Sequence, residues 1–172
     1  NNLLQSSSKN YVLNFVEKEK KINSDIIEIH NRPNYIQYLK EIKNKKIILY
    51  FHNDPLTMNG SKNIKDRLYL LNNIDKILFN SKWSQKRFFI GIENETLLKQ
   101  KTSICYQSIS RVPIDFTKKR KIISFVGKLN TAKGYNLFGE AILKILDKYK
   151  DWKAVVIGDE PREKISFNHK NL

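Results

Sequence analysis

The sequence has one cysteine, few arginines and no long apolar run, and each shortage excludes a class of protein. The single cysteine leaves no partner for an internal disulfide and too few thiolates for a cysteine-rich zinc site. A reducing, cytoplasmic setting fits this composition best. No run of about 18 apolar residues occurs, so the sequence predicts no membrane-spanning helix. Hydrophobic residues still make up 40% of the 172 positions, enough for the core of one domain or of two small ones.

Arginine is scarce although the chain is strongly basic. Lysine and arginine together number 32 against 17 acidic residues, a net charge of +15, but 26 of the 32 are lysines and only six are arginines. With 19 asparagines and 22 isoleucines, this is the composition that AT-rich codons favour. Because base-specific recognition relies on arginine, we do not expect a nucleic-acid partner. A basic nucleic-acid or anionic-surface binding protein remains the alternative, and the charge is compatible with peripheral contact at the inner face of a membrane.

Segments typical of strands and of helices alternate along the chain. Short apolar runs predict strands at residues 25–30, 47–52, 75–80, 122–127 and 153–158, with a weaker one at 103–107. Helical periodicity lies between them, at residues 11–21, from Pro33 onward, and at 64–71, 83–90 and 135–149. Ser81 stands where a helix N-cap is expected. This alternation predicts an α/β fold with a mostly parallel sheet.

A polar and basic stretch over residues 108–120 predicts a linker between two units. We expect an N-terminal Rossmann-like domain over residues 1–115 and the first β-α-β of a second Rossmann-like domain over residues 121–172. One β-α-β of about 50 residues is too little to cover both faces of a sheet. We therefore expect that the chain is cut short at its C-terminus and at its N-terminus.

Two of the three histidines fall where parallel sheets bind ligands, at the carboxyl ends of strands. His30 is followed by Asn31-Arg32-Pro33, and His52 is followed by Asn53-Asp54-Pro55. Near neutral pH an imidazole can act as an acid, a base or a hydrogen-bond donor. The alternative, that each histidine merely caps its strand, is about equally favoured.

The loop after the strand at 122–127 has the features of a diphosphate site. Gly127 allows a ligand to approach the backbone, and Lys128 and Lys133 add two cations. The helix that begins near Gly134 offers unpaired N–H groups to an anion. The spacing matches neither the Walker loop nor the G-x-G-x-x-G pattern. An ordinary strand–helix connection with solvated lysines is the alternative interpretation.

Other polar groups receive simpler interpretations. Asp159, Glu160 and Glu163 follow the last strand and are interpreted as solvated loop acids, since no cluster of metal ligands surrounds them. Cys105 lies in an apolar stretch, so we expect it to pack rather than to react. His169 belongs to a polar tail, and we expect it to be exposed.

The stretch 125–134 resembles the phosphate-binding segment of glycosyltransferase family 4, also called glycosyl transferase group 1. The family pattern is Gly-Arg-Leu followed by Lys-Gly a few positions later; Lys128 stands at the arginine position, and Lys133-Gly134 match. The spacing to residues 154–159, the strand that ends in His52, and residues 77–81 before a helix are also similar to the family. The resemblance covers most of residues 25–172, although Gln107-Ser108 stands where Asn-Gly is commoner.

This resemblance implies a GT-B fold, in which two Rossmann-like domains face each other across a cleft. It implies an enzyme that transfers a sugar from a nucleotide-sugar donor to a glycan, lipid-linked or small-molecule acceptor in cell-surface glycan biosynthesis. The reaction is expected to retain the anomeric configuration and to need neither a cofactor nor a metal ion.

The resemblance also implies roles for particular residues. The donor diphosphate would be bound by Gly127, Lys128, Lys133 and Gly134, with Gly158 and Asp159 near the nucleotide. His52 would be the catalytic group that contacts the transferred sugar, and the acceptor side would be formed by His30, Arg32 and Asn53. The paired glutamates of the family, eight positions apart, have no counterpart and are expected beyond Leu172. An inactive α/β fragment therefore stays open as a further alternative.

Overall fold

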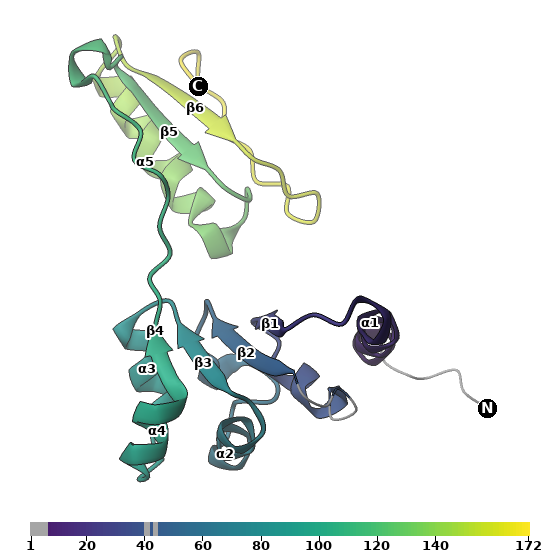
Figure 1. Ribbon diagram of the computed structural model, residues 1–172. Coiled ribbons are helices and arrows are strands. Elements are labelled where there is room, and N and C mark those ends of the chain that lie inside the picture. The colour runs from purple at the N-terminus through teal and green to yellow at the C-terminus, as the bar shows by residue number, and fades with distance from the viewer. Residues whose placement is uncertain (1–6, 40–41, 43–44) are drawn as a thin grey trace. The chain divides into compact units, whose positions relative to one another are not determined.

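The computed structural model describes residues 7–39, 42 and 45–172, so residues 1–6 of the predicted first domain lie outside it (Figure 1). The chain divides into two compact units, which meet at Ser110 and Arg111, within the predicted linker. We call them unit 1 and unit 2 and describe each by itself. Both are built from parallel strands and helices, which confirms the predicted α/β class. No helix of the described residues is long and apolar enough to cross a membrane.

Unit 1 contains a parallel sheet whose four strands lie side by side in chain order. They are β1 (Ile26–His30), β2 (Lys46–Phe51), β3 (Lys76–Phe79) and β4 (Thr102–Ile104). The register pairs His30 with Tyr50 and Phe51 with Phe79. The carboxyl ends of all four strands therefore lie at one edge of the sheet, where His30 and His52 were predicted. β4 is shorter than the strand predicted at 103–107.

The helices of unit 1 are α1 (Ser7–Ile22), α2 (Ile64–Asn73), α3 (Lys82–Phe89) and α4 (Glu95–Lys101), with short 3-10 turns η1 (Pro33–Tyr38) and η2 (Pro55–Thr57). The Ser81 cap is confirmed, because its hydroxyl accepts from the amide of Ser84 at 3.2 Å. The helix that opens at Pro33 is a 3-10 turn rather than an α-helix. The helix α4 was not predicted from the sequence, since only Leu98 of this short helix is buried.

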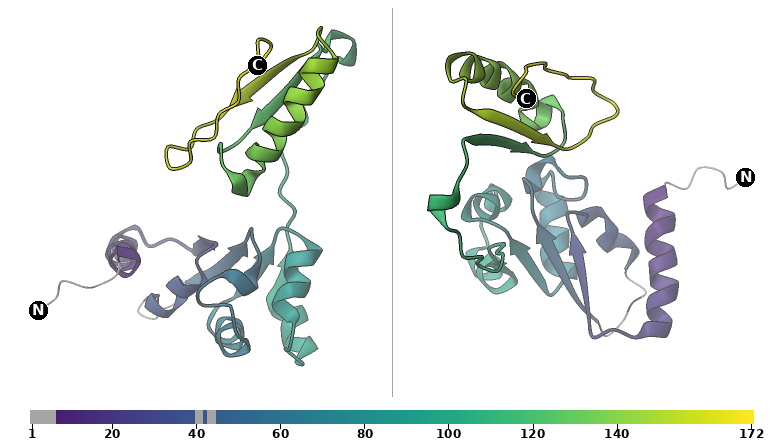
Figure 2. Two further views of the ribbon diagram at one scale, coloured as in Figure 1. Left: turned by 180° about the vertical axis from the view of Figure 1, so that it is seen from behind. Right: turned by 90° about the horizontal axis from the view of Figure 1, so that it is seen from above.

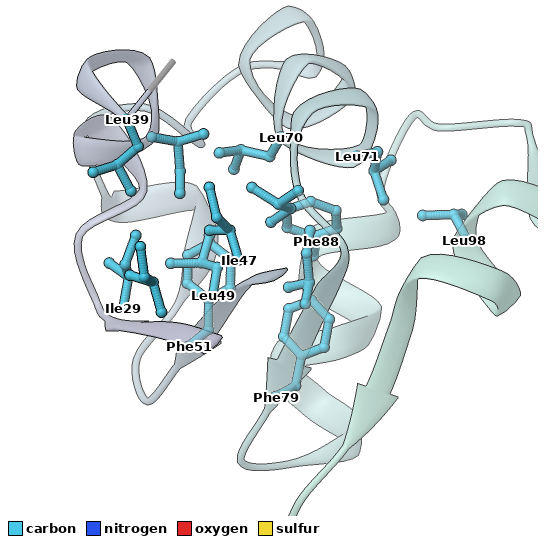
Figure 3. Close-up of a cluster of buried hydrophobic side chains, with 14 of the residues drawn as sticks. Ile29, Leu39, Ile47, Leu49, Phe51, Leu70, Leu71, Phe79, Phe88 and Leu98 are labelled. Atoms are coloured by element: carbon cyan, nitrogen blue, oxygen red, sulfur yellow. The ribbon is translucent and has the colours of Figure 1, made fainter. Parts of the chain in front are cut away.

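The core of unit 1 lies on one face of the sheet (Figure 3). Alternate strand residues, among them Leu49, Phe51 and Phe79, point to this face and are fully buried. The rings of Phe51 and Phe79 stack with centroids 5.6 Å apart, and α2, α3 and α4 add buried side chains from above. Burying each such side chain contributes about 1.5–3 kcal/mol.

The opposite face of this sheet is less covered, and it carries the histidines. β1 alternates between exposed and buried residues, with Ile26 53% exposed, and Glu28 and His30 also lie on this exposed face. His30, its register partner Tyr50, and His52 two residues later therefore share one face at the carboxyl edge of the sheet.

Unit 2 is a single β-α-β element. The parallel strands β5 (Ile122–Val126) and β6 (Lys153–Ile157) have α5 (Tyr135–Lys148) across one face (Figure 2). Short turns η3 (Phe116–Lys118) and η4 (Thr131–Lys133) precede β5 and α5. Ile142, Leu146 and Ala154 form its buried core. Val126 and Ile157 are 73% and 58% exposed on the other face, in line with the expectation that one β-α-β does not cover both.

The tail after β6 folds back on unit 2, so the prediction that His169 is exposed is wrong. Its side chain is only 12% exposed, and its Nδ1 accepts from the amide of Asn171 at 3.0 Å. The Asn171 side chain donates to the carbonyls of Lys150 and Trp152, each at 3.0 Å. Phe167 packs its ring beside Gly139, where a Cβ atom would lie 1.9 Å from that ring. The ring of Phe167 and the hydrogen bonds of His169 and Asn171 thus hold the tail against unit 2.

Candidate functional site

The carboxyl edge of the unit 1 sheet brings His30 and His52 into direct contact. His30 Nδ1 and His52 Nε2 are 2.7 Å apart, and the rings stack with their centroids 5.0 Å apart. The ring of Tyr50 lies 4.3 Å from that of His52 and 5.6 Å from that of His30. Both histidines were predicted at this edge; the hydrogen bond between them was not predicted.

Two asparagines hold the backbone of His52 in place. Asn31 accepts from the His52 amide through its side-chain oxygen at 2.8 Å, and Asn80 donates to the His52 carbonyl at 2.7 Å. Asn31 has φ 52, a left-handed conformation that asparagine tolerates better than most residues. Sequence analysis did not find this role, although each asparagine directly follows a strand.

Tyr50 forms the floor of the histidine pair. Its side chain is buried, and its hydroxyl donates to the carbonyl of Cys105. Burial, and after it the neighbourhood of Cys105, raises the pKa of Tyr50 above its ordinary value. Cys105 itself is exposed, so the prediction that it packs is wrong. Cys105 lies one residue beyond the end of β4, where its amide still donates to the carbonyl of Phe79 at 2.9 Å but its side chain is exposed.

A cavity of about 550 Å³ opens beside the pair, between β1, α1 and η1. Tyr11 and Tyr35, with ring centroids 6.1 Å apart, line it together with His30 and Arg32. The structure thus brings together two of the three residues predicted for the acceptor side. Asn53 is exposed and does not line this cavity.

The loop that follows His52 is fixed by an ion pair between Asp54 and Arg87. Asp54 Oδ2 accepts from Arg87 Nε at 3.1 Å and from Nη2 at 2.9 Å, and Oδ1 accepts from the amide of Leu56 at 3.0 Å. Burial raises the pKa of Asp54, but the bonds from Arg87 and Leu56 outweigh it and lower the pKa overall. This pair connects η2 to α3 and keeps the residues after His52 in one arrangement.

Unit 2 gathers the predicted donor residues at the carboxyl ends of β5 and β6. Gly158 packs on Gly127 so closely that a Cβ atom on Gly158 would lie 1.8 Å from the Gly127 carbonyl oxygen. Gly134 has φ 74 and begins α5 without a side-chain cap. The side chains of Lys128 and Lys133 are exposed, and in the described part of the chain their ammonium groups form no ion pair or hydrogen bond. Asp159 is exposed after Gly158.

The loop from Lys128 to Gly134 is held by acids that sequence analysis interpreted as solvated. That interpretation is wrong for Glu160, which is 6% exposed and accepts from Arg162 Nε at 2.7 Å and from Asn130 Nδ2 at 3.3 Å. The bond from Arg162 lowers the pKa of Glu160 to about 2. Glu163 accepts from the amide and the hydroxyl of Thr131 at 2.9 and 3.1 Å. Their position could have indicated this role, because they follow β6, which pairs with β5 and ends at the same edge of the sheet.

Asn130 is the centre of this arrangement and was not singled out from the sequence. Its side-chain oxygen accepts from the amide of Lys133 at 3.0 Å, and its carbonyl accepts from the amide of Tyr135 at 3.2 Å. With the side-chain bond to Glu160, this one buried residue connects the loop, the start of α5 and the segment after β6. Within the described residues, no group of three or more His, Cys, Asp or Glu side chains is placed to hold a metal ion.

Neither a protein-family model nor a curated protein matches the chain. Solved structures do match, among them one described as accessory secretory protein 1, 2 and 3 of Streptococcus pneumoniae, at 16% identity and a TM-score of 0.54. Anabaena Alr3699/HepE in complex with UDP-glucose matches at 16% identity and a TM-score of 0.55. Staphylococcus aureus MnaA with UDP matches at 13% identity and a TM-score of 0.52.

These matches cover 87%, 86% and 99% of this chain, but only 30%, 43% and 52% of the three structures. The chain therefore spans between about a third and a half of the length of the structures it resembles. At such low identity the likeness concerns the fold, and the parallel strand order of both units agrees with it. The chain has a GT-B-like α/β fold with Rossmann-like topology.

Proposed function

We propose that the chain carries the donor site of a family 4 glycosyltransferase, which transfers a sugar from a nucleotide-sugar to an acceptor. The observation that carries the proposal is the loop from Gly127 to Gly134. It combines two exposed lysines, a helix start without a side-chain cap, and a buried asparagine that fixes its shape. The solved complexes with UDP-glucose and UDP support UDP as the nucleotide to test.

The physical argument concerns the charge of a diphosphate. A leaving nucleoside diphosphate carries negative charge that fixed cations and N–H dipoles stabilise. Lys128 and Lys133 stand on either side of the loop, and the N-terminus of α5 adds the positive end of a helix dipole. The contacts of Asn130 and Glu160 hold these groups before a ligand binds, which lowers the entropy cost of binding.

In unit 1 we assign the transferred sugar to His52 and the acceptor to the side of His30, Arg32 and Asn53. The cavity beside β1 supports this assignment for His30 and Arg32, since aromatic walls and polar groups suit a hydroxyl-rich or amphipathic acceptor. His52→Ala is expected to slow release of UDP from UDP-glucose while UDP affinity stays unchanged. A parallel fall in UDP affinity would remove His52 from the catalytic role.

The finer features of the proposal follow from the family resemblance. The reaction would retain the anomeric configuration, need no metal ion or cofactor, and serve cell-surface glycan biosynthesis. The protein would work in the cytoplasm, with peripheral contact at the inner membrane face through its net charge of +15. Glycans, lipid-linked sugars and small molecules are the acceptor classes to screen.

Calorimetric titration with UDP tests the donor site in the 172-residue chain. Lys133→Ala and Lys128→Ala are each expected to weaken binding about tenfold or more, because a hydrogen bond to a charged group contributes about 1.5–3 kcal/mol. Lys144→Ala is the matched control, since it removes the same charge from the exposed middle of α5. It should change the affinity less than twofold.

Two results would overturn the assignment. An equal loss in all three variants would mean that UDP is attracted only by the overall positive charge, as in a general anionic-surface binder. Absence of saturable UDP binding would favour the inactive-fragment alternative. A steep dependence of binding on salt without any difference between Lys133→Ala and Lys144→Ala would point in the first direction.

A further inference from the structure

We infer that Glu28, His30 and His52 form a chain of contacts that sets the tautomer of His52 and leaves its Nδ1 as a hydrogen-bond acceptor. His30 is then a positioning residue that acts through His52. The inference rests on the proposed function only for what meets Nδ1, which would be a hydroxyl group of the sugar or the acceptor. The tautomer itself can be measured without any ligand.

The first step is the bond between the rings. His30 Nδ1 and His52 Nε2 lie 2.7 Å apart, so one of these nitrogens carries a proton and the other accepts it. Two neutral imidazoles can meet this condition in either of two directions. The direction decides whether the remaining nitrogen of His52 is a donor or an acceptor.

The second step is the carboxylate on the far side of His30. Glu28 Oε1 lies 3.5 Å from His30 Nε2. An ionised carboxylate only accepts, so it favours a proton on Nε2 and disfavours a lone pair there. Neutral His30 then has its lone pair on Nδ1 and must accept the bond from His52 Nε2. The second nitrogen of His52, Nδ1, is left without a proton.

The third step is that, among the residues that the structure describes, no other protein group bonds to the ring nitrogens of His52. The Tyr50 hydroxyl is engaged with the Cys105 carbonyl, although its ring contacts both histidines. The amide and the carbonyl of His52 are held by Asn31 and Asn80, so the base of the side chain is fixed. His52 Nδ1 bonds to no side chain or backbone group in the part of the chain that the structure describes.

The chemical consequence is that His52 presents a hydrogen-bond acceptor, and not a donor, at the edge of the sheet. A half-buried imidazole with a free lone pair accepts a hydrogen bond from a hydroxyl group and can take its proton. The opposite tautomer would donate and would suit a phosphate or a carbonyl oxygen. The chain from Glu28 therefore selects hydroxyl donors at this position.

The test is nitrogen NMR of histidine-labelled protein at pH 8, where the 15N chemical shifts identify the tautomer of each neutral ring. We expect both His30 and His52 as Nε2–H tautomers, with a 15N–15N coupling across the ring–ring bond. Free neutral histidine also prefers Nε2–H, so the decisive variant is Glu28→Lys. Its ammonium donates to His30 Nε2 and should reverse both rings, so that His52 becomes mainly Nδ1–H.

Glu95→Lys is the matched control, because Glu95 is also an exposed glutamate but lies on α4 beside Lys99. It should leave the tautomers unchanged, and His30→Ala should abolish the coupling. A His52 that keeps the same tautomer in Glu28→Lys, or a wild type without the coupling, would overturn the inference. Neither result depends on UDP, so failure of the donor site would be recognised separately in the titration of Lys133→Ala.

Discussion

Replacing the buried Arg67 of α2 is expected to weaken unit 1 by releasing the end of α3. Arg67 is 3% exposed, and burial lowers the pKa of its guanidinium. Nη1 donates to the carbonyl of Phe88 and, at 2.8 Å, to that of Ile90; Nε donates to the carbonyl of Asn63 at 3.2 Å. Because α3 ends at Phe89, its last carbonyls have no partner within the helix, and Arg67 supplies one.

The size of this loss of stability follows from the carbonyl groups that Arg67→Met leaves without a donor. The Asn63 carbonyl keeps its bond from the main-chain amide of residue 67, and Ile90 is 51% exposed, so water can reach it. The Phe88 carbonyl is buried and loses its only charged donor, which costs about 1–3 kcal/mol. Relief of the buried guanidinium offsets part of the total loss. We expect the free energy of unfolding of unit 1 to fall by about 1–2 kcal/mol.

Urea unfolding followed by fluorescence measures this change. The chain has two tryptophans, so Trp152→Phe leaves Trp83 on α3 as the reporter of unit 1. Arg67→Lys should fall between wild type and methionine, because lysine keeps a charged donor. Lys65→Met, at an exposed cation of the same helix, should change the stability of unit 1 by less than about 0.5 kcal/mol. A loss in Arg67→Met no larger than in this control would refute the role of Arg67 as a cap of α3.

Three further predictions concern unit 2. Gly158→Ala places a Cβ atom 1.8 Å from the Gly127 carbonyl oxygen, so it should clearly lower the thermal midpoint of unit 2. Gly134→Ala should lower it less, because its Cβ atom meets no atom within 4 Å and the only cost is the left-handed backbone, about 1 kcal/mol. The folded pKa of Glu160, about 2 against an ordinary 4.5, means that its contribution is complete above about pH 4.5 and is lost as the pH falls toward 2. Glu160→Gln should therefore make the urea midpoint of unit 2 depend less on pH between about pH 4.5 and 2. An unchanged pH dependence in this range would contradict the stabilising role of ionised Glu160. Asn130→Ala should speed hydrogen exchange at the amide of Lys133 and weaken UDP binding. Unchanged exchange at this amide would show that the loop does not need the Asn130 side chain.

The strands could be predicted because their local patterns agree with the final fold. Continuous apolar runs such as 47–52 are typical of parallel strands that are buried on both faces, and β2 occupies nearly the same residues. The short α4 and the 3-10 turn at Pro33 could not be predicted with the same security. Their few apolar positions give no clear period, and packing against the rest of unit 1 decides their form.

The candidate sites show the same difference. Position at a strand end was enough to single out His30, His52 and the loop after β5. The contacts that make them sites join residues far apart in sequence, as in the bond between His30 and His52 or between Asn130 and Glu160. No local pattern records such a contact, which is why Glu160 and His169 were misjudged as exposed.

Local sequence patterns were sufficient to predict the α/β class, the order of the strands and most of the helices, and the loop from Gly127 to Gly134 as a candidate site. These follow from local propensity and periodicity, which act over a few residues. Only the tertiary structure decided which polar groups are buried, which acids hold that loop, and how the two histidines meet. Burial and hydrogen bonding depend on which residues become neighbours in the folded chain. The register of the parallel strands decides this, because it pairs residues that are tens of positions apart in the sequence.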